Sequence, residues 1–351
     1  MRAPSYVPLD DALEALAPYG IELKNGNSNH APMVAEALCA LGRPEAVMPW
    51  LDRYRERMLP RPAAVDRIRR DDWRSSLGRR DRFAEWSAFF GEELQEMPWR
   101  QALDRWVGRL APGFAAAATH GVIRVGHAAR SLSISETTPR LRELADALAS
   151  WAATYQELPA GHHAVSGTLT PREAITRVAV IPPDRRRSLG NITASLAMLD
   201  DFDEFAPAIG LLDTGGEIAP LLSELTEVFA RVYLANTHSI LTAIVFIHGV
   251  TSHAALGNIA PHVSDATAHA ALPYAWQTGC GLYACFGGGT AMAEDVGRCE
   301  KDDETLIDLA IANGDEHVIK FTEACLRRNT VSPSPAYRAA VDHVLGAIRR
   351  G

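Results

Sequence analysis

Lysine, cysteine and long apolar runs are all scarce in this 351-residue sequence. The shortage of cysteine argues against a disulfide framework, and the shortage of long apolar runs argues against a membrane-spanning protein. Lysine accounts for only three of the 35 Lys and Arg residues, at Lys24, Lys301 and Lys320. The formal net charge of −8 does not favour a nucleic-acid partner bound through phosphate neutralisation. The locally basic run 67–82 is interleaved with aspartate, which is typical of a solvated surface.

The five cysteines are odd in number and include no Cys-x-x-Cys pair, which argues against a disulfide or zinc framework and fits reduced thiols. The N-terminus has no apolar core of signal-peptide length. The most apolar stretch, Ile240–Val250, is far shorter than a bilayer-spanning helix. We therefore expect a cytoplasmic protein without a membrane partner. The sequence carries no signal for an oligomeric state.

Helical periodicity, in contrast, runs through most of the chain. There are few runs of strict apolar–polar alternation and no strand–turn–helix repeat, so we predict an all-α fold, with one compact multi-helix domain over residues 1–351. Residues 257–273 are expected to form a loop, and the segment 156–190, rich in Gly, Pro, Thr and Arg, a long connection or a lid with a short helix at 171–178. The other expected helices lie at 8–19, 31–41, 44–58, 80–110, 115–132, 141–155, 190–200, 218–235, 237–256, 276–285, 303–312, 315–328 and 335–349.

Lys320 stands out because it lies in an apolar setting, within the segment Val318–Phe321. A lysine in such a place either extends its ammonium group to water or is buried and loses its proton. A neutral lysine can act as a nucleophile, or take up carbon dioxide to form a carbamate, which is an anionic metal ligand. The alternative is a helical ion pair with Glu316 or Glu323, four residues before and three after.

Four of the twelve histidines lie in apolar or small-residue segments, where a charged imidazole would be costly. They are His30, His120, His248 and His317. Each taken singly fits a hydrogen-bonded core histidine. Histidines on different helices are also how an all-α protein builds a metal site in its core, and imidazole suits iron, zinc, copper and nickel. His317 and Lys320 are three residues apart and share a helix face.

Five short segments, in this order along the chain, resemble the questin oxidase-like family. They are Asn29–His30 before an Ala-rich helix, Leu41–Gly42 with Leu51–Tyr54, His120–Arg124, Phe246–Ser252 and Asp315–Lys320. The resemblance covers about residues 10 to 330. The chain departs from the family pattern at Gly121, where the family usually has proline, and at Glu316, where it often has glycine.

The resemblance implies an α-helical fold and an oxygen-dependent ring-opening activity on polycyclic aromatic, anthraquinone-like or polyketide-like ketones. This activity has been described both as non-haem iron dioxygenation and as NADPH-dependent Baeyer–Villiger oxidation. In the iron-dependent members, Fe(II) is held in the helical core by four histidines and a lysine carboxylated by carbon dioxide. Carried over residue by residue, these ligands are His30, His120, His248, His317 and Lys320, the same five that stand out by context. Asp315 or Glu316 is expected to orient a ligand imidazole.

Four further residues are candidates for catalysis: His127, His253, Arg124 and Thr251. His127 and His253, like His238, lie close in sequence to the proposed ligands, so each could replace a ligand or act as a general base on the substrate. Arg124 and Thr251 are candidates for contacting the substrate or oxygen derived from dioxygen.

Three other functions are compatible with the same residues. A carboxylated lysine with histidines also suits a zinc or nickel hydrolase that activates water. Metal-free oxidation with NADPH as the electron source is a second alternative. Against it, the Gly287–Thr290 segment follows no convincing strand and is not a dinucleotide fingerprint. The third is a non-catalytic binding protein whose histidines are core hydrogen-bonding groups.

Overall fold

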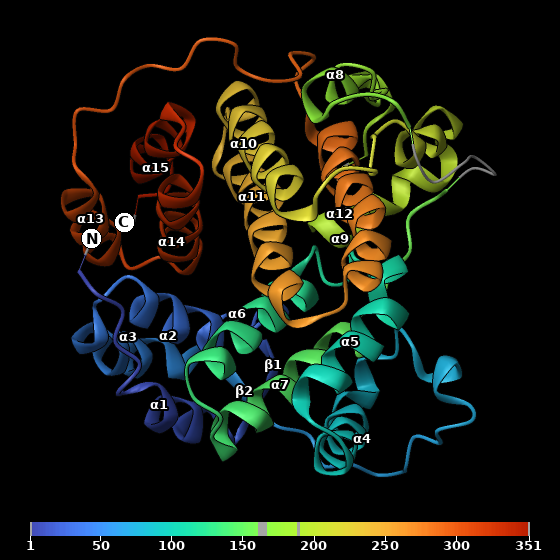
Figure 1. Ribbon diagram of the computed structural model, residues 1–351, viewed down its shortest axis with the longest axis vertical. Coiled ribbons are helices and arrows are strands. Elements are labelled where there is room, and N and C mark those ends of the chain that lie inside the picture. The colour runs from blue at the N-terminus through green and yellow to red at the C-terminus, as the bar shows by residue number, and fades with distance from the viewer. Residues whose placement is uncertain (1, 161–166, 188–189, 350–351) are drawn as a thin grey trace.

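Helices make up 67% of the chain and strands 3% in the computed structural model, which describes residues 2–160, 167–187 and 190–349 (Figure 1). The prediction of a single compact, mostly helical domain is therefore confirmed. The α-helices are α1 (Leu9–Leu16), α2 (Ala31–Ala40), α3 (Val47–Tyr54), α4 (Phe83–Glu96), α5 (Trp99–Leu110), α6 (His120–Ile134), α7 (Thr138–Ala153), α8 (Pro171–Ile175), α9 (Ile192–Leu196), α10 (Ile218–Asn236), α11 (Ile240–Ile259), α12 (Asp265–Phe286), α13 (Asp303–Asn313), α14 (Glu316–Val331) and α15 (Pro335–Ala347). Two short antiparallel strands, β1 (Tyr19–Leu23) and β2 (Met58–Pro60), were not expected from the sequence.

Helix α11 forms the centre of the fold, with α6, α10, α12 and α14 packed against it. All residues from Val245 to Leu256 are buried, as expected of a helix that is apolar on every side. Together with the turn that follows it, α11 spans Ile240–His262 and is the one helix of the described residues that is long and apolar enough to cross a membrane. This span is longer than the apolar stretch Ile240–Val250 that stands out in the sequence. However, 72% of its most apolar window is buried inside the protein, as in a core helix.

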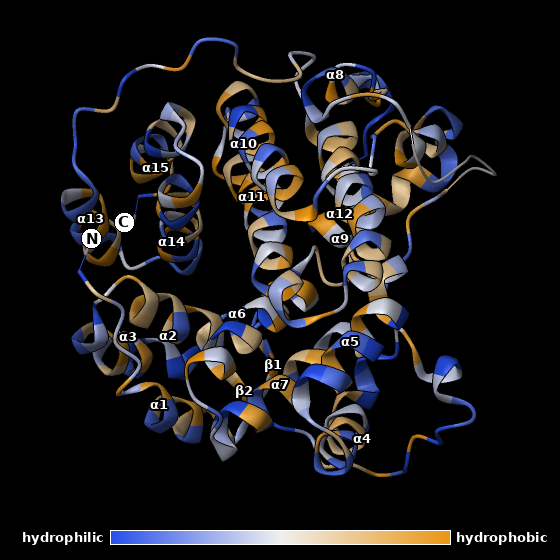
Figure 2. Ribbon diagram, viewed as in Figure 1, coloured by the Kyte–Doolittle hydropathy of each residue, from blue (hydrophilic) through white to orange (hydrophobic). Residues whose placement is uncertain are grey.

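Four helices from distant parts of the chain meet in a closed ring: α2 packs on α6, α6 on α11, α11 on α14, and α14 on α2. Figure 1 shows the N-terminal helices α1–α3 beneath the C-terminal helices α13–α15, with both chain ends near α13. The outer helices α4 and α5 carry hydrophilic and hydrophobic residues side by side (Figure 2), as amphipathic surface helices do. The ring thus lies in the interior, where the two halves of the chain join.

Several element boundaries differ from the sequence prediction, and three of the differences bear on the packing. The helix expected from residue 115 begins at His120, because Ala117–Thr119 turn in the left-handed sense. Helix α12 begins at Asp265, inside the expected loop 257–273, since Ser264 caps it through the Thr267 amide and Pro273 is accommodated within it. The helical pattern at 80–110 is divided between two helices, which break at Met97 and Pro98.

The described parts of the segment 156–190 form a connection that holds the short helix α8 and a 3-10 turn at Pro183–Arg185, and that contacts α12. Ile181 donates its backbone N–H to Ala284, and the Gln277 side chain donates to the carbonyl of Pro159. Residues 161–166 and 188–189, which include His162 and His163, lie outside the described residues. A lid role for this segment stays a prediction.

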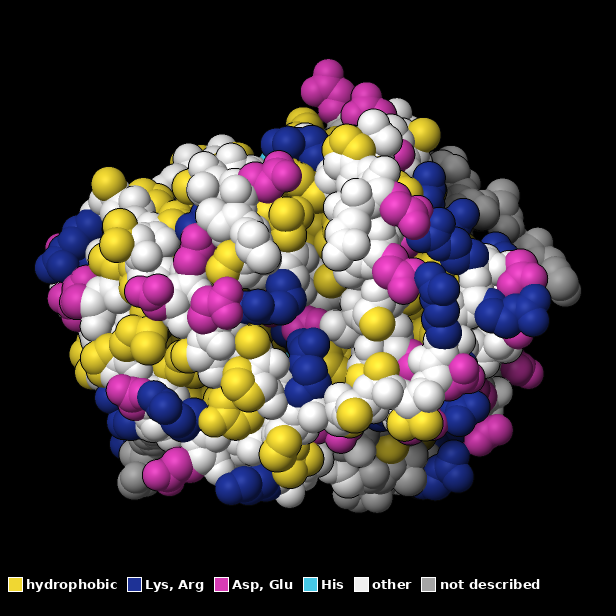
Figure 3. All heavy atoms as spheres, turned by 90° about the horizontal axis from the view of Figure 1, so that it is seen from below, with side chains coloured by type: hydrophobic (Ala, Val, Ile, Leu, Met, Phe, Trp, Pro, Cys, Tyr) yellow, Lys and Arg dark blue, Asp and Glu magenta, His cyan; other side chains and the backbone are white. Residues whose placement is uncertain are grey.

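Charges on the surface are mixed in sign. On the face shown in Figure 3, Lys and Arg side chains are interspersed with Asp and Glu. In the basic run 67–82, most arginines pair with a carboxylate, as Arg69 does with Asp71 and Arg79 with Asp81. The run is therefore a solvated surface whose arginines are paired with carboxylates from inside and outside the run, as Arg80 is with Glu22.

Candidate metal centre

The helix ring brings together the four histidines that the sequence singles out. His30 precedes α2, His120 begins α6, His248 lies within α11, and His317 lies in the first turn of α14. Their ring centroids are 4.5 Å apart for His30 and His120, 4.7 Å for His120 and His248, 5.7 Å for His248 and His317, and 4.7 Å for His317 and His30. The four imidazoles therefore form a closed ring of their own.

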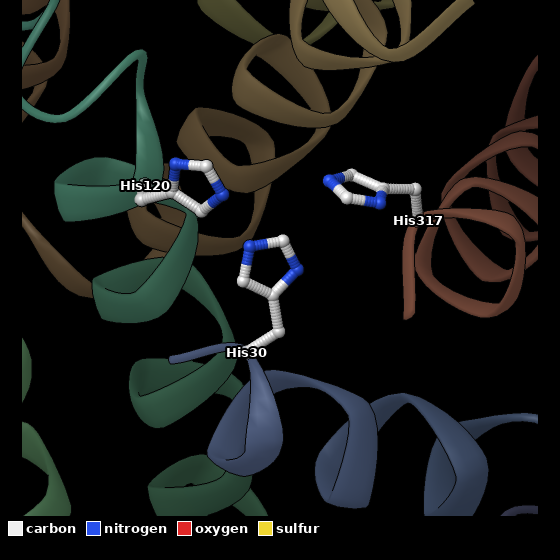
Figure 4. A group of neighbouring side chains, drawn as sticks. All are labelled: His30, His120 and His317. Atoms are coloured by element: carbon white, nitrogen blue, oxygen red, sulfur yellow. The ribbon is translucent and has the colours of Figure 1, made fainter. Parts of the chain in front are cut away.

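Three of these rings converge closely enough to share one ion. One nitrogen from each of His30, His120 and His317 lies within 4.8 Å of the others, and Figure 4 shows the rings pointing toward one another from three separate helices. His248 contacts the group through His120, with the two Nε2 atoms 3.3 Å apart. Imidazole nitrogens in this arrangement are a donor set for a transition metal.

An unusual turn positions His120. Ala117, Ala118 and Thr119 have φ angles of 48°, 55° and 73°. The left-handed conformation costs L-residues about 1–2 kcal/mol each, and a β-branched threonine there is a clear outlier. The turn places the carbonyl of Ala117 2.5 Å from His120 Nδ1. Because His120 is the first residue of α6, no right-handed turn precedes it, and the reversed turn supplies the carbonyl instead.

His248 obtains the same kind of contact from its own helix. Its Nδ1 lies 2.6 Å from the carbonyl of Ile244, four residues earlier. A carbonyl oxygen only accepts, so Nδ1 of both His120 and His248 carries the proton and both Nε2 atoms present a lone pair. Those lone pairs face each other across 3.3 Å, and neither ring has a proton to donate between them.

The remaining two histidines differ in how they are held. His317 Nδ1 lies 3.2 Å from Asp315 Oδ1, and the same carboxylate caps α14 by accepting the His317 backbone N–H at 2.8 Å. Asp315 therefore orients this imidazole, one of the two alternatives expected. Among the described residues, His30 Nδ1 is buried without a hydrogen-bond partner. A buried polar atom without a partner is costly, and a bound ion or water would satisfy it.

Lys320 lies one turn after His317 on α14, and its side chain is 2% exposed. Burial lowers the pKa of its amine to about 8. The two glutamates at ion-pair spacing, Glu316 and Glu323, bind arginines instead. Among the residues that the structure describes, Lys320 has no hydrogen bond and no ion pair, so the helical ion pair considered as its alternative role is not formed.

Burial and nearby positive charge set the protonation state of three of the histidines. Burial lowers the pKa of His30, His120 and His248 well below the usual value for histidine, and the positive charge of Lys320 lowers all three further. The imidazoles are therefore neutral at pH 7, which is the form that binds a metal.

Helix α3 supports the ligand segments from outside. Trp50 Nε1 donates to the carbonyl of Gly314, which ends α13 just before His317, at 2.9 Å. Tyr54 Oη accepts the backbone N–H of His30 at 3.1 Å. The family-like segment Leu51–Tyr54 points to this stretch in the sequence, but no sequence pattern indicates that it contacts both ends of the site.

The four candidate catalytic residues have other partners. His127 Nδ1 lies 2.6 Å from Glu36, and Arg124 makes a bidentate pair with Glu143 at 2.6 and 2.7 Å. Thr251 donates to the carbonyl of Ile247 within its own helix. His253 stacks on Phe229 at 4.5 Å and donates from Nδ1 to Gly249. These contacts give each side chain a structural role, and a catalytic role for them stays a prediction.

His238 lies before α11, where its backbone N–H donates to Thr242 at an exposed position. This contact does not indicate that His238 replaces one of the four clustered histidines. The contacts of His127 with Glu36 and of His253 with Phe229 do not indicate a ligand role for those two residues either.

Comparison with known proteins gives one result. A family model described as Questin oxidase-like matches residues 27–325, a span that contains all four clustered histidines and Lys320. No curated protein matches the chain.

Proposed function

Because the chain belongs to the questin oxidase-like family, we propose that it is a mononuclear non-haem iron oxygenase. Family membership indicates an oxygenase-type oxidoreductase that acts on polyketide-like substrates. The proposed ligands of Fe(II) are His30, His120, His248, His317 and Lys320 as its carbamate. The proposed reaction is oxidative ring cleavage or hydroxylation of a polycyclic aromatic ketone.

The observation that carries this proposal is the pair of Nε2 lone pairs of His120 and His248 at 3.3 Å. Both rings have their Nδ1 proton committed to a carbonyl, so they cannot form a hydrogen bond with each other. In a buried site this contact is repulsive unless a cation lies beside both atoms. Within the described residues, the unpartnered His30 Nδ1 is one more buried polar group that a metal site would satisfy. Lys320, a buried residue without an ion pair in the same part of the chain, is another candidate.

The donor set fits an oxygen-activating dication. Four neutral imidazoles and one carbamate leave a net charge of about +1 and room for an exchangeable ligand. Bound there, Fe(II) would supply the redox chemistry that activates dioxygen beside the substrate. The chain's own residues orient the imidazoles through Ala117, Ile244 and Asp315, and the buried helix ring excludes bulk water.

Metal analysis of protein purified without air or chelator tests the proposal. We expect about one iron per chain, as for a mononuclear site. The variant His248→Ala should lose the iron. His253→Gln is the matched control, because His253 lies on the same helix, is equally buried and donates from Nδ1 to a carbonyl four residues earlier.

Two results would contradict the proposal. Full iron occupancy and activity in His248→Ala would remove that ligand, and wild-type protein without metal even after reconstitution would remove the site. Zinc or nickel at full occupancy, with turnover in the absence of oxygen, would favour the hydrolase, since the same donors suit both metals.

A further inference from the structure

Lys320 has two acidic neighbours on its own helix, and arginines bind both. Glu316 lies four residues before Lys320 and receives two hydrogen bonds from Arg57, at 2.9 and 3.1 Å. Glu323 lies three residues after it and accepts from Arg130 and from Arg327. Lys320 itself has no ion-pair partner in the described part of the chain.

The Glu316 position is the more important of the two for Lys320. A glutamate four residues N-terminal to a lysine is the favoured orientation for a helical ion pair. The side chain of Glu316 is only 9% exposed, so without Arg57 its buried negative charge would be stabilised by pairing with another cation. Lys320 lies on the same helix face, one turn away. The structure therefore depends on Arg57 to occupy this carboxylate.

Arg57 is well built for this task. Its planar guanidinium binds both carboxylate oxygens of Glu316, a geometry that a lysine ammonium cannot reproduce. It also lies over the ring of Tyr54, 4.7 Å from the centroid. Tyr54 in turn stacks on Trp50 at 4.5 Å, so the guanidinium rests on an ordered aromatic pair.

We propose that Arg57 is a positioning residue that holds Glu316 away from Lys320 and so leaves the lysine amine free for carbon dioxide. This inference rests on the proposed carbamate ligand. In the reaction, the Lys320 ammonium first loses one proton to solvent, and the Nζ lone pair of the neutral amine then attacks the carbon of carbon dioxide and forms an N–C bond. One C=O bond pair moves to oxygen, and a second Nζ proton leaves to solvent. No electrons are transferred to or from an outside reagent.

Arg57 suits substitution because its side chain is 40% exposed. The test compares wild type with Arg57→Met, Glu316→Gln and the double variant, each loaded with Zn²⁺ as a diamagnetic probe under ¹³C-labelled bicarbonate. The ¹³C NMR signal of the lysine carbamate and the Zn²⁺ dissociation constant are measured. Arg338→Met is the control, since Arg338 is equally exposed and also pairs with a carboxylate, through one hydrogen bond from Nε to Asp303 at 2.8 Å.

We expect Arg57→Met to lose most of the carbamate signal and to bind Zn²⁺ about tenfold more weakly, the usual scale for residues that support a metal ligand. Glu316→Gln should keep the signal, because no competing carboxylate remains. The double variant should regain it for the same reason. Arg338→Met should match wild type.

A purely structural salt bridge predicts the opposite pattern. Glu316→Gln would then be as harmful as Arg57→Met, and the double variant would show no recovery; that result would overturn the role of Arg57. An unchanged signal in Arg57→Met would overturn it as well. If Arg57→Met does not fold, Arg57→Lys replaces it, with a partial loss of signal that Glu316→Gln relieves. A wild-type protein that binds no metal and shows no carbamate would instead overturn the proposed function.

Discussion

The Nε2 atoms of His120 and His248 face each other at 3.3 Å while each ring gives its only proton to a backbone carbonyl. Two neutral imidazoles held this way store an unfavourable contact that a cation relieves. Burial of the same cluster makes the metal-free protein sensitive to acid, because it disfavours the protonated form of both imidazoles in the folded state.

Acid should destabilise the metal-free protein as the pH falls below about 6.5, the pKa of histidine in an unfolded chain. Burial first, and then positive charge on Lys320 and on the neighbouring histidines, holds the pKa of His30, His120 and His248 well below that value, so the unfolded state binds more protons than the folded state. Stability is then fully present above pH 6.5 and is lost as the pH falls toward the folded pKa values, by about 1.4 kcal/mol per histidine per pH unit. Urea unfolding between pH 5 and pH 8 measures it; a free energy of unfolding independent of pH would contradict the neutral assignment.

Ala118→Gly should stabilise the protein relative to Ala129→Gly. Both substitutions remove one buried methyl group from the same region of the chain. Glycine accepts the positive φ of residue 118, whereas residue 129 lies in right-handed helix α6, where glycine costs about 1 kcal/mol. Thermal unfolding should separate the two variants by about 2 kcal/mol in favour of Ala118→Gly. Equal losses would mean that the reversed turn stores no strain.

Tyr54→Phe should weaken metal binding through His30. The variant removes the acceptor of the buried His30 backbone N–H, which costs about 1–3 kcal/mol and loosens the start of α2. Tyr337→Phe is a suitable control, because Tyr337 is also buried and donates its hydroxyl to the carbonyl of Ser223. We expect both variants to lose stability and only Tyr54→Phe to lose metal affinity, by about tenfold in a calorimetric titration. The same affinity in both would remove the supporting role of Tyr54.

Lys320→Met should separate stability from function. Methionine has a similar length and no charge, so it removes a buried amine without an ion-pair partner and should raise the free energy of unfolding of the metal-free protein by about 1–3 kcal/mol. The same variant should fail to bind iron at full occupancy. Lys320→Arg should also fail, because guanidinium stays protonated and cannot form a carbamate. Normal turnover in either variant would remove the carbamate ligand.

The sequence predicts which residues form the candidate site better than it predicts which residues support them. His30, His120, His248 and Lys320 are visible because each is a polar group in an apolar segment, and such residues are buried only when something pairs with them. The structure adds what local patterns do not contain. Arg57 and Glu316 are 259 positions apart in the chain, so no helical spacing relates them.

The reversed turn before α6 shows why local propensity failed there. A run of alanines is the strongest helix signal in a sequence, and it predicts a right-handed helix from residue 115. Tertiary packing overrides that preference at Ala117–Thr119, where all three residues are buried. Strand β2 was missed for another reason: at three residues it is too short to show an alternating pattern.

The order of the ligand helices along the chain also has a consequence for assembly. His30 precedes α2, whereas His317 and Lys320 lie on α14, so the proposed donors come from segments far apart in the sequence. Helices α2 and α14 contact each other only once the fold has formed. Metal binding at the proposed site would therefore report that these helices have docked, and a chain in which they stay apart would leave its histidine-bearing helices open to quality-control proteases.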